Sequence, residues 1–193
     1  MSEFPKIWFL RHGETYWNAE KRVQGRKESD LTRKGRMQAE MQSMLMAPVL
    51  EDRGIPCLVS PLRRAQQTAR IALGGRDYET DPRLAEAMAG VFEGRTLDEI
   101  AQSHPDISSA HPHALDLFCE APGGEGFDAF EARIRSVLMS LEQPTVLVAH
   151  GLWGQVLRGI ICGLGRAEMA ALPNEQGCVY VLENGEEFVL RVE

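Results

Sequence analysis

The sequence has 193 residues, of which 44% are hydrophobic and 25% charged, enough for one domain with a buried core. Its net charge is −7, and its densest basic stretch, residues 21–36, is interleaved with acidic residues, which argues against a nucleic-acid partner. The four cysteines lack the spacing of a disulfide framework or zinc site. With no evident leader and no apolar run near ~20 residues, we expect a cytoplasmic protein without a membrane partner.

The hydrophobic pattern predicts strands that alternate with helices along the chain. Strands are expected at 6–10, 56–60, 78–80 and 145–149, with a closing hairpin at 178–182 and 188–192 around Asn184-Gly185. Helices are expected at 14–20, 32–48, 61–73, 96–102, 127–141 and after Gly151. This alternation indicates an α/β fold, a three-layer α/β/α sandwich with a mainly parallel central sheet.

One segment interrupts this regular pattern. Residues 81–123 carry four prolines and only one short predicted helix, so we expect a single domain over 1–193 in which 87–123 forms a cap or lid. Met37, Met41 and Met44 recur at helical spacing in the helix after Thr32 and are expected to lie in the core.

Reactive and cationic side chains stand directly after predicted strands. Arg11 and His12 follow the first strand, Arg63 follows the second, and His150 follows the strand at 145–149. Ligands of α/β folds bind beyond the carboxyl ends of such strands. A phosphate monoester needs fixed positive charge and hydrogen-bond donors, and a neutral imidazole can attack its phosphorus. We therefore predict His12 as a nucleophile and His150 as a second phosphate donor.

A series of short motifs then carries a family resemblance. The chain resembles the histidine phosphatase superfamily, in its phosphoglycerate-mutase-like branch. The matching pieces occur in the family's order over nearly the whole chain: Leu10-Arg11-His12-Gly13-Glu14-Thr15, Gln24-Gly25, Leu31-Thr32, Gly35, Gln38-Ala39, Ser60-Pro61-Leu62-Arg63-Arg64-Ala65, Thr68-Ala69, Leu84-Ala85-Glu86, Gly90, Phe92-Glu93-Gly94, Pro122-Gly123-Gly124-Glu125 and Val148-Ala149-His150-Gly151.

The resemblance implies a phosphoglycerate-mutase-like fold and a metal-independent phosphomonoester hydrolase without an organic cofactor. It implies that His12 carries the phosphoryl group and that Glu86 protonates the leaving oxygen. The phosphate pocket it implies consists of Arg11, Arg63, His150, Asn18 and Gly151, with Gln24 at the substrate rim. The partner it implies is a small phosphorylated substrate.

Other interpretations stay open. The pair Gln24-Gly25 is followed by Arg26-Lys27-Glu28, where the family often has Trp-x-Asp, so a relative's substrate cannot be transferred. A phosphoglycerate-type mutase and a catalytically silent phospholigand-binding module are the alternatives. His104, His111 and His113 lack a clear further metal ligand, so a metal site there is disfavoured. The sequence leaves the substrate and the oligomeric state undetermined.

Overall fold

The fold centres on one mixed sheet, seen in a computed structural model that describes residues 4–192. Its strand order is β3-β2-β4-β1-β5-β6. The first four strands of this order run parallel, whereas β5 is antiparallel to β1 and β6 is antiparallel to β5. The strands are β1 (Ile7–Arg11), β2 (Cys57–Val59), β3 (Glu79–Thr80), β4 (Thr145–Ala149), β5 (Val179–Glu183) and β6 (Glu186–Leu190).

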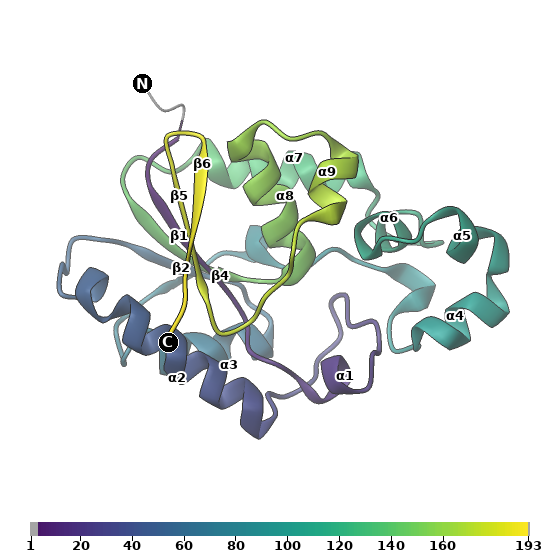
Figure 1. Cartoon of the computed structure of the whole chain (residues 1–193), viewed down its shortest axis with the longest axis horizontal. Helices are drawn as coiled ribbons and strands as arrows, with labels where there is room; N and C mark the ends of the chain where they lie inside the picture. The colour runs from purple at the N-terminus through teal and green to yellow at the C-terminus, as the bar shows by residue number, and fades with distance from the viewer. Residues whose placement is uncertain (1–3, 193) are drawn as a thin grey trace.

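Helices cover both faces of this sheet, as Figure 1 shows, and the predicted three-layer α/β/α sandwich is confirmed. One layer contains α2 (Arg33–Leu50) and α3 (Arg63–Ala72), and the opposite layer contains α7 (Phe127–Leu138), α8 (Gly151–Cys162) and α9 (Arg166–Ala171). A short helix, α1 (Tyr16–Ala19), follows β1, and 3-10 turns occupy Pro82–Leu84 and Gly90–Phe92. No helix within 4–192 is both long and apolar enough to span a bilayer.

Two hydrophobic cores hold the layers to the sheet. Alternate residues of β4 face opposite sides, so Val146 and Val148 pack under α2 and α3 while Leu147 packs under α7 and α8. All five residues of β4 are buried, as expected for a central strand covered on both faces. The strand ends that carry the site are therefore anchored in the least exposed part of the molecule.

The structure corrects the prediction for the methionines of α2. Met37 and Met44 are 54% and 63% exposed. The buried stripe of the helix is instead Gly35, Ala39, Gln42 and Met46. This stripe lies about half a turn away from Met37 and Met44 at 3.6 residues per turn. Gly35 determines which face of α2 is buried, because a Cβ at this position would lie 2.0 Å from the carbonyl oxygen of Glu14.

The segment predicted as a cap is more helical than the sequence pattern indicates. It contains α4 (Leu97–Ser103), α5 (Pro105–Ala110) and α6 (Ala114–Cys119), where one short helix was expected. These helices lie together at one end of the molecule, beyond the sheet (Figure 1, teal). They enclose a small core of their own, formed by Val23, Ala89, Phe92, Ile100, Leu117 and Ala121. Their periodicity is hidden because each is only six or seven residues long.

Gly154→Ala is expected to destabilise the fold. A Cβ on Gly154 would lie 2.2 Å from Cε1 of Phe9, so the ring on β1 would have to move. The predicted cost is about 1–3 kcal/mol from overpacking, which outweighs the ~1 kcal/mol that alanine gains in helix propensity. Urea unfolding measures the difference. Met139→Ala, at a side chain that is 82% exposed, should change the free energy of unfolding by no more than about 0.5 kcal/mol. A Gly154→Ala protein of unchanged stability would contradict the packing described here.

Candidate active site

The carboxyl ends of β1, β2 and β4 meet at one edge of the sheet. The N–H of His12 donates to the carbonyl of Ala149 over 3.0 Å, and the N–H of Ser60 donates to that of Val148 over 2.9 Å. These bonds extend the parallel pairing just past the strands, so the residues that follow each strand are brought together. A cavity of about 150 Å³ opens at this edge. Of the predicted site residues, those lining the cavity are Arg11, His12, Asn18, Gln24, Glu86 and Gly151.

His12 is buried and held in one orientation. Its Nδ1 lies 2.8 Å from the carbonyl oxygen of Gly13, and its Nε2 accepts a hydrogen bond from Nε of Arg64 over 3.2 Å. This pairing fits the tautomer in which Nδ1 carries the proton and Nε2 carries the lone pair. Burial, with Arg64 and Arg11 nearby, lowers the pKa of His12 well below 6.5. The imidazole is therefore neutral at neutral pH, the form that can act as a nucleophile.

The second arginine of the cavity is Arg64, and the expectation for Arg63 is corrected. The Arg63 side chain is 61% exposed, and its Nη1 faces Asp30 at 3.6 Å, outside the cavity. Arg64 is 1% exposed and also donates to the carbonyls of Gly25 and Lys27. Burial lowers the pKa of Arg64 to about 10, so the guanidinium stays charged at neutral pH.

The position of Arg64 follows from the register of α3. Ala65, Ala69 and Ala72 form the buried inner stripe of this helix. At 100° per residue, Arg63 lies nearly opposite that stripe, whereas Arg64 lies on its flank. A helical projection of this segment therefore contains the signal that separates the two arginines.

His150 lies fully buried beside His12, with 5.2 Å between the ring centroids. Its Nε2 is 2.6 Å from the hydroxyl of Ser60. Its Nδ1 is buried and has no hydrogen-bond partner within the described residues. Burial, together with Arg64 and His12, lowers the pKa of His150 well below its usual value, so this ring is also neutral at neutral pH.

Arg11 also lines the cavity. One Nη donates to the carbonyl of Asn174, while its Nε is buried and lacks a partner among residues 4–192. A Cβ on Gly151 would lie 3.2 Å from this Nε, so the glycine leaves the guanidinium room. Buried donors without partners are costly, and they are satisfied when an anion binds. Arg11 and His150 each contribute one such nitrogen.

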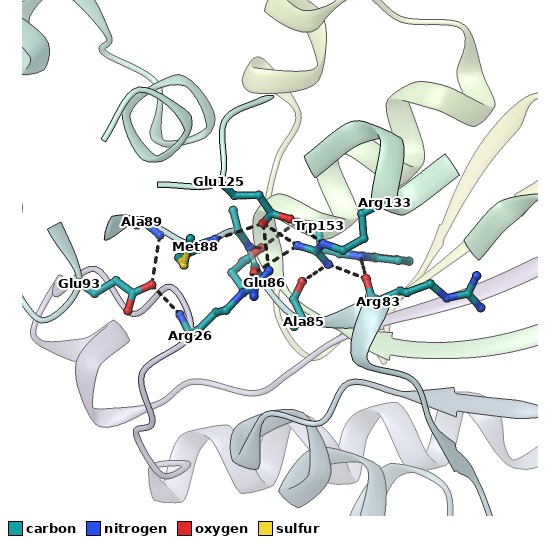
Figure 2. A network of polar contacts seen from close by, with 11 residues as sticks. Arg26, Arg83, Ala85, Glu86, Met88, Ala89, Glu93, Glu125, Arg133 and Trp153 are labelled. Atoms are coloured by element: carbon teal, nitrogen blue, oxygen red, sulfur yellow. Dashed lines mark hydrogen bonds and ion pairs between the residues drawn. The ribbon is translucent and has the colours of Figure 1, made fainter. Parts of the chain in front are cut away.

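Glu86 approaches the cavity from a loop that follows the 3-10 turn Pro82–Leu84. Its carboxylate is 7% exposed overall and accepts three backbone hydrogen bonds. The donors are the N–H groups of Leu152 and Trp153, at 3.1 and 3.0 Å, and that of Ala87 at 3.0 Å. The first two belong to the first turn of α8, where unpaired N–H groups favour a carboxylate. Figure 2 shows Glu86 beside Trp153.

Asn18 and Gln24 lie on the cavity wall as expected. The Oδ1 of Asn18 accepts from the N–H of Thr15 over 3.1 Å, so the residue also caps α1. Further lining residues were not predicted from the sequence, since they come from loops and from the cap helix α6. These residues are Arg22, Gly25, Ala114, Phe118, Leu152 and Asn174.

No group of three or more His, Cys, Asp or Glu side chains is arranged to hold a metal ion among residues 4–192. His104 instead lies edge-on to Phe92, with 5.1 Å between ring centroids, and contacts the hydroxyl of Ser103. The cysteines are unpaired thiols, of which three are buried.

The sequence and the fold of this chain are similar to those of known proteins. A sequence model of the histidine phosphatase superfamily, branch 1, matches residues 7–191. "Probable phosphoglycerate mutase GpmB" of Escherichia fergusonii is 35% identical over 167 residues, 82% of this chain and 75% of the relative. YhfR of Bacillus stearothermophilus superposes with a TM-score of 0.80 at 29% identity, covering 97% of this chain and 96% of its own. The alpha-ribazole phosphatase of Shigella flexneri gives a TM-score of 0.78 at 28% identity, with 97% and 94% coverage.

The fold and the buried pair of histidines thus define an enzyme of the histidine phosphatase class. The chain belongs to the histidine phosphatase superfamily, branch 1.

Arg64→Met and Arg63→Met form a matched pair that tests which arginine serves the cavity. We expect Arg64→Met to lower kcat/KM for a phosphomonoester by about 10²–10³-fold, the range for losing one buried charge-stabilising donor. Arg63→Met should stay within about threefold, because its charge is solvent-screened. Titration calorimetry with inorganic phosphate should show weaker binding for Arg64→Met alone. Equal losses in the two variants would contradict this assignment.

The two buried histidines should make stability depend on pH. Both have a lowered pKa in the folded state, so the unfolded chain takes up protons first as the pH falls below about 6.5. Stability is therefore highest above neutral pH and declines as the pH falls through about 6.5. Between about pH 7 and about pH 5.5 the two groups should remove about 2 kcal/mol from the free energy of unfolding. In urea unfolding, His150→Asn should show about half of this fall in the free energy of unfolding. A fall as large as that of the wild type would refute the contribution of His150 to the pH dependence.

Proposed function

We propose that this protein hydrolyses small phosphomonoesters through a phosphohistidine intermediate on His12. The observation that carries the proposal is a neutral His12 whose Nε2 lone pair lies against buried Arg64. Arg11 and His150 each have a buried nitrogen nearby without a hydrogen-bond partner among residues 4–192. A nucleophile thus lies in the cavity wall, and nitrogens that can donate to a dianion lie in that wall or beside His12.

In the first step the phosphate group binds between Arg11, Arg64 and His150. The buried Nε of Arg11 and Nδ1 of His150 donate to its oxygens, and Ser60 holds the other nitrogen of His150 in place. Asn18 and the backbone N–H of Gly151 add further donors. Arg64 shifts its Nε–H from His12 to the phosphate, which frees the Nε2 lone pair for attack.

In the chemical steps Nε2 of His12 bonds to phosphorus as the bond from phosphorus to the leaving oxygen breaks. Glu86 gives its proton to that oxygen, and the alcohol departs. A water molecule then attacks the phosphorus of phospho-His12 and transfers a proton to the Glu86 carboxylate. The phosphorus–nitrogen bond breaks, which releases inorganic phosphate and restores His12 and Glu86.

The surroundings of the cavity bear on the substrate. At about 150 Å³ the cavity suits a phosphate group with a small organic part. Ala114 and Phe118 of α6 border it, so we assign residues 87–123 the role of a cap over the substrate, with Gln24 at the rim. The predicted cytoplasmic location belongs to the same proposal and agrees with four unpaired cysteines. Neither nucleic acid nor a membrane is part of it.

A phosphoglycerate-type mutase is the second candidate, favoured by the 35% identity to "Probable phosphoglycerate mutase GpmB". A mutase would return the phosphoryl group from His12 to an organic acceptor in place of water. Conversion of 3-phosphoglycerate to its isomer, with a bisphosphoglycerate primer, separates the two activities. Isomerisation that outpaces phosphate release would replace the phosphatase proposal.

The direct test compares wild-type protein with His12→Ala on a generic aryl phosphate and on a panel of metabolite phosphates. We expect His12→Ala to lose at least about 10³-fold in kcat, because the covalent route is removed. Rapid quenching of the wild type should also trap acid-labile phosphate on the protein. Equal activity of the two proteins would overturn the proposal. Tight vanadate binding without turnover would favour a catalytically silent module.

A further inference from the structure

Arg133, in the middle of α7, makes an unusual set of contacts with the loop that carries Glu86. One Nη donates to the carbonyls of Arg83 and Ala85, at 2.6 and 2.7 Å, and the other reaches the carbonyl of Glu86 at 3.4 Å. Its Nε and Nη2 also form a two-point ion pair with Glu125, at 2.7 and 2.8 Å. One guanidinium therefore binds three backbone carbonyls within residues 83–86 and the carboxylate of Glu125 (Figure 2).

The loop needs such a partner, since it has little regular structure of its own. After the 3-10 turn Pro82–Leu84, residues 85–89 belong to neither a helix nor a strand. Backbone carbonyls in buried loops must be satisfied from elsewhere, and Arg133 supplies that donor set from a rigid helix. The indole N–H of Trp153 adds a bond to the carbonyl of Arg83 over 3.0 Å.

Glu125 connects this arrangement to the cavity wall. Besides Arg133, it accepts from Nη2 of Arg26 at 3.2 Å and from the N–H of Met88 at 3.4 Å. Arg26 in turn reaches the carbonyl of Glu86 at 3.4 Å, and its backbone N–H donates to Glu93 (Figure 2). The Glu125 side chain is 13% exposed, so these bonds are largely shielded from water.

Glu86 is thereby held from two sides. The first turn of α8 binds the carboxylate of Glu86. Arg133 on α7 binds the backbone carbonyl of Glu86 and carbonyls of the residues before it. Both helices pack in the same hydrophobic core, so the two attachments are fixed relative to each other. The loop and the carboxylate have few independent movements left.

We propose that Arg133, locked by Glu125, is a positioning residue that aims Glu86 at the leaving oxygen of the substrate. The inference rests on the proposed phosphatase function, in which Glu86 is the proton donor. Arg133 does not line the cavity, so it acts only through the Glu86 loop. Displacing a catalytic group by about 1 Å can cost about 10²-fold in rate, so such support has a measurable effect.

The test uses two substrates of similar shape, phenyl phosphate and 4-nitrophenyl phosphate. Phenol is a much weaker acid than 4-nitrophenol, so its departure depends far more on a proton from Glu86. The parameter kcat/KM reports the step that breaks the bond to the leaving group. We expect Arg133→Met to lower kcat/KM for phenyl phosphate by about 30- to 100-fold, and that for 4-nitrophenyl phosphate by no more than about threefold.

Matched variants distinguish a loss of Glu86 positioning from a general loss of structure or activity. Arg135→Met changes an arginine on the same helix whose guanidinium pairs with Glu131 at the surface, and it should leave the activity on both substrates unchanged. Glu125→Gln removes the charge that locks Arg133 and should show the same selective loss, about tenfold on phenyl phosphate. If Arg133→Met is too unstable to assay, Glu125→Gln still tests the proposal. Arg133→Met leaves the charged carboxylate of Glu125 without its ion-pair partner, whereas Glu125→Gln removes that charge. Vanadate binding checks that the phosphate pocket is intact in each.

A double-mutant cycle with Glu86→Gln completes the design. If Arg133 acts through Glu86, adding Arg133→Met to Glu86→Gln should change the ratio of the two substrates by less than about threefold. Equal losses on both substrates, or an undiminished effect of Arg133→Met in the Glu86→Gln background, would overturn the positioning role. Failure of the phosphatase proposal is distinct, because wild-type protein would then match His12→Ala on both substrates.

Discussion

The buried guanidinium of Arg64 against Nε2 of His12 is the contact on which the rest of the site depends. A charge with 1% exposure is costly to bury, and the carbonyls of Gly25 and Lys27 offset part of that cost. Burial, together with this positive charge, keeps His12 neutral, and the contact marks which of its nitrogens carries the lone pair. Arg11, nearby, adds a second cation, whose buried Nε has no partner among residues 4–192. The cavity is thus suited to an anion, and the protein is less stable when no anion offsets its buried positive charge.

The acid side of the site is built differently. Glu86 stands on an irregular loop, and its position depends on side chains and helix ends from elsewhere in the chain. Backbone N–H groups at the N-terminus of α8 donate to the carboxylate of Glu86, and Arg133 of α7 donates to its backbone carbonyl. His150 occupies the N-cap position of the same helix, so in the proposed mechanism the start of α8 serves both the phosphate pocket and the proton donor. This shared support explains how groups from distant parts of the chain keep a common geometry.

Several elements could be predicted because their signals are local. The strand at 145–149 was predicted with its bounds as observed, because a short, almost wholly apolar run is typical of a strand buried on both faces. The hairpin turn at Asn184-Gly185 was also correct, and both residues have positive φ there, 56° and 79°. By contrast, α5 and α6 were missed because helices of six residues offer too few turns to show a period. The methionines of α2 were placed in the core because they recur at helical spacing, whereas the close approach of Gly35 to Glu14 requires the opposite face of the helix to be buried.

The sequence by itself determined the class of fold, the family and the identity of His12, His150 and Glu86 as candidates, because ordered motifs at strand ends are local features. From the sequence we selected Arg63, although the helical projection of this segment separates the two arginines, and the packing of α3 shows that Arg64 is the one that faces the cavity. The sequence could not reveal Arg133, which lies 47 positions from Glu86 in the chain. Contacts across such distances depend on how α7 and α8 pack together, and that is a property of the tertiary structure alone.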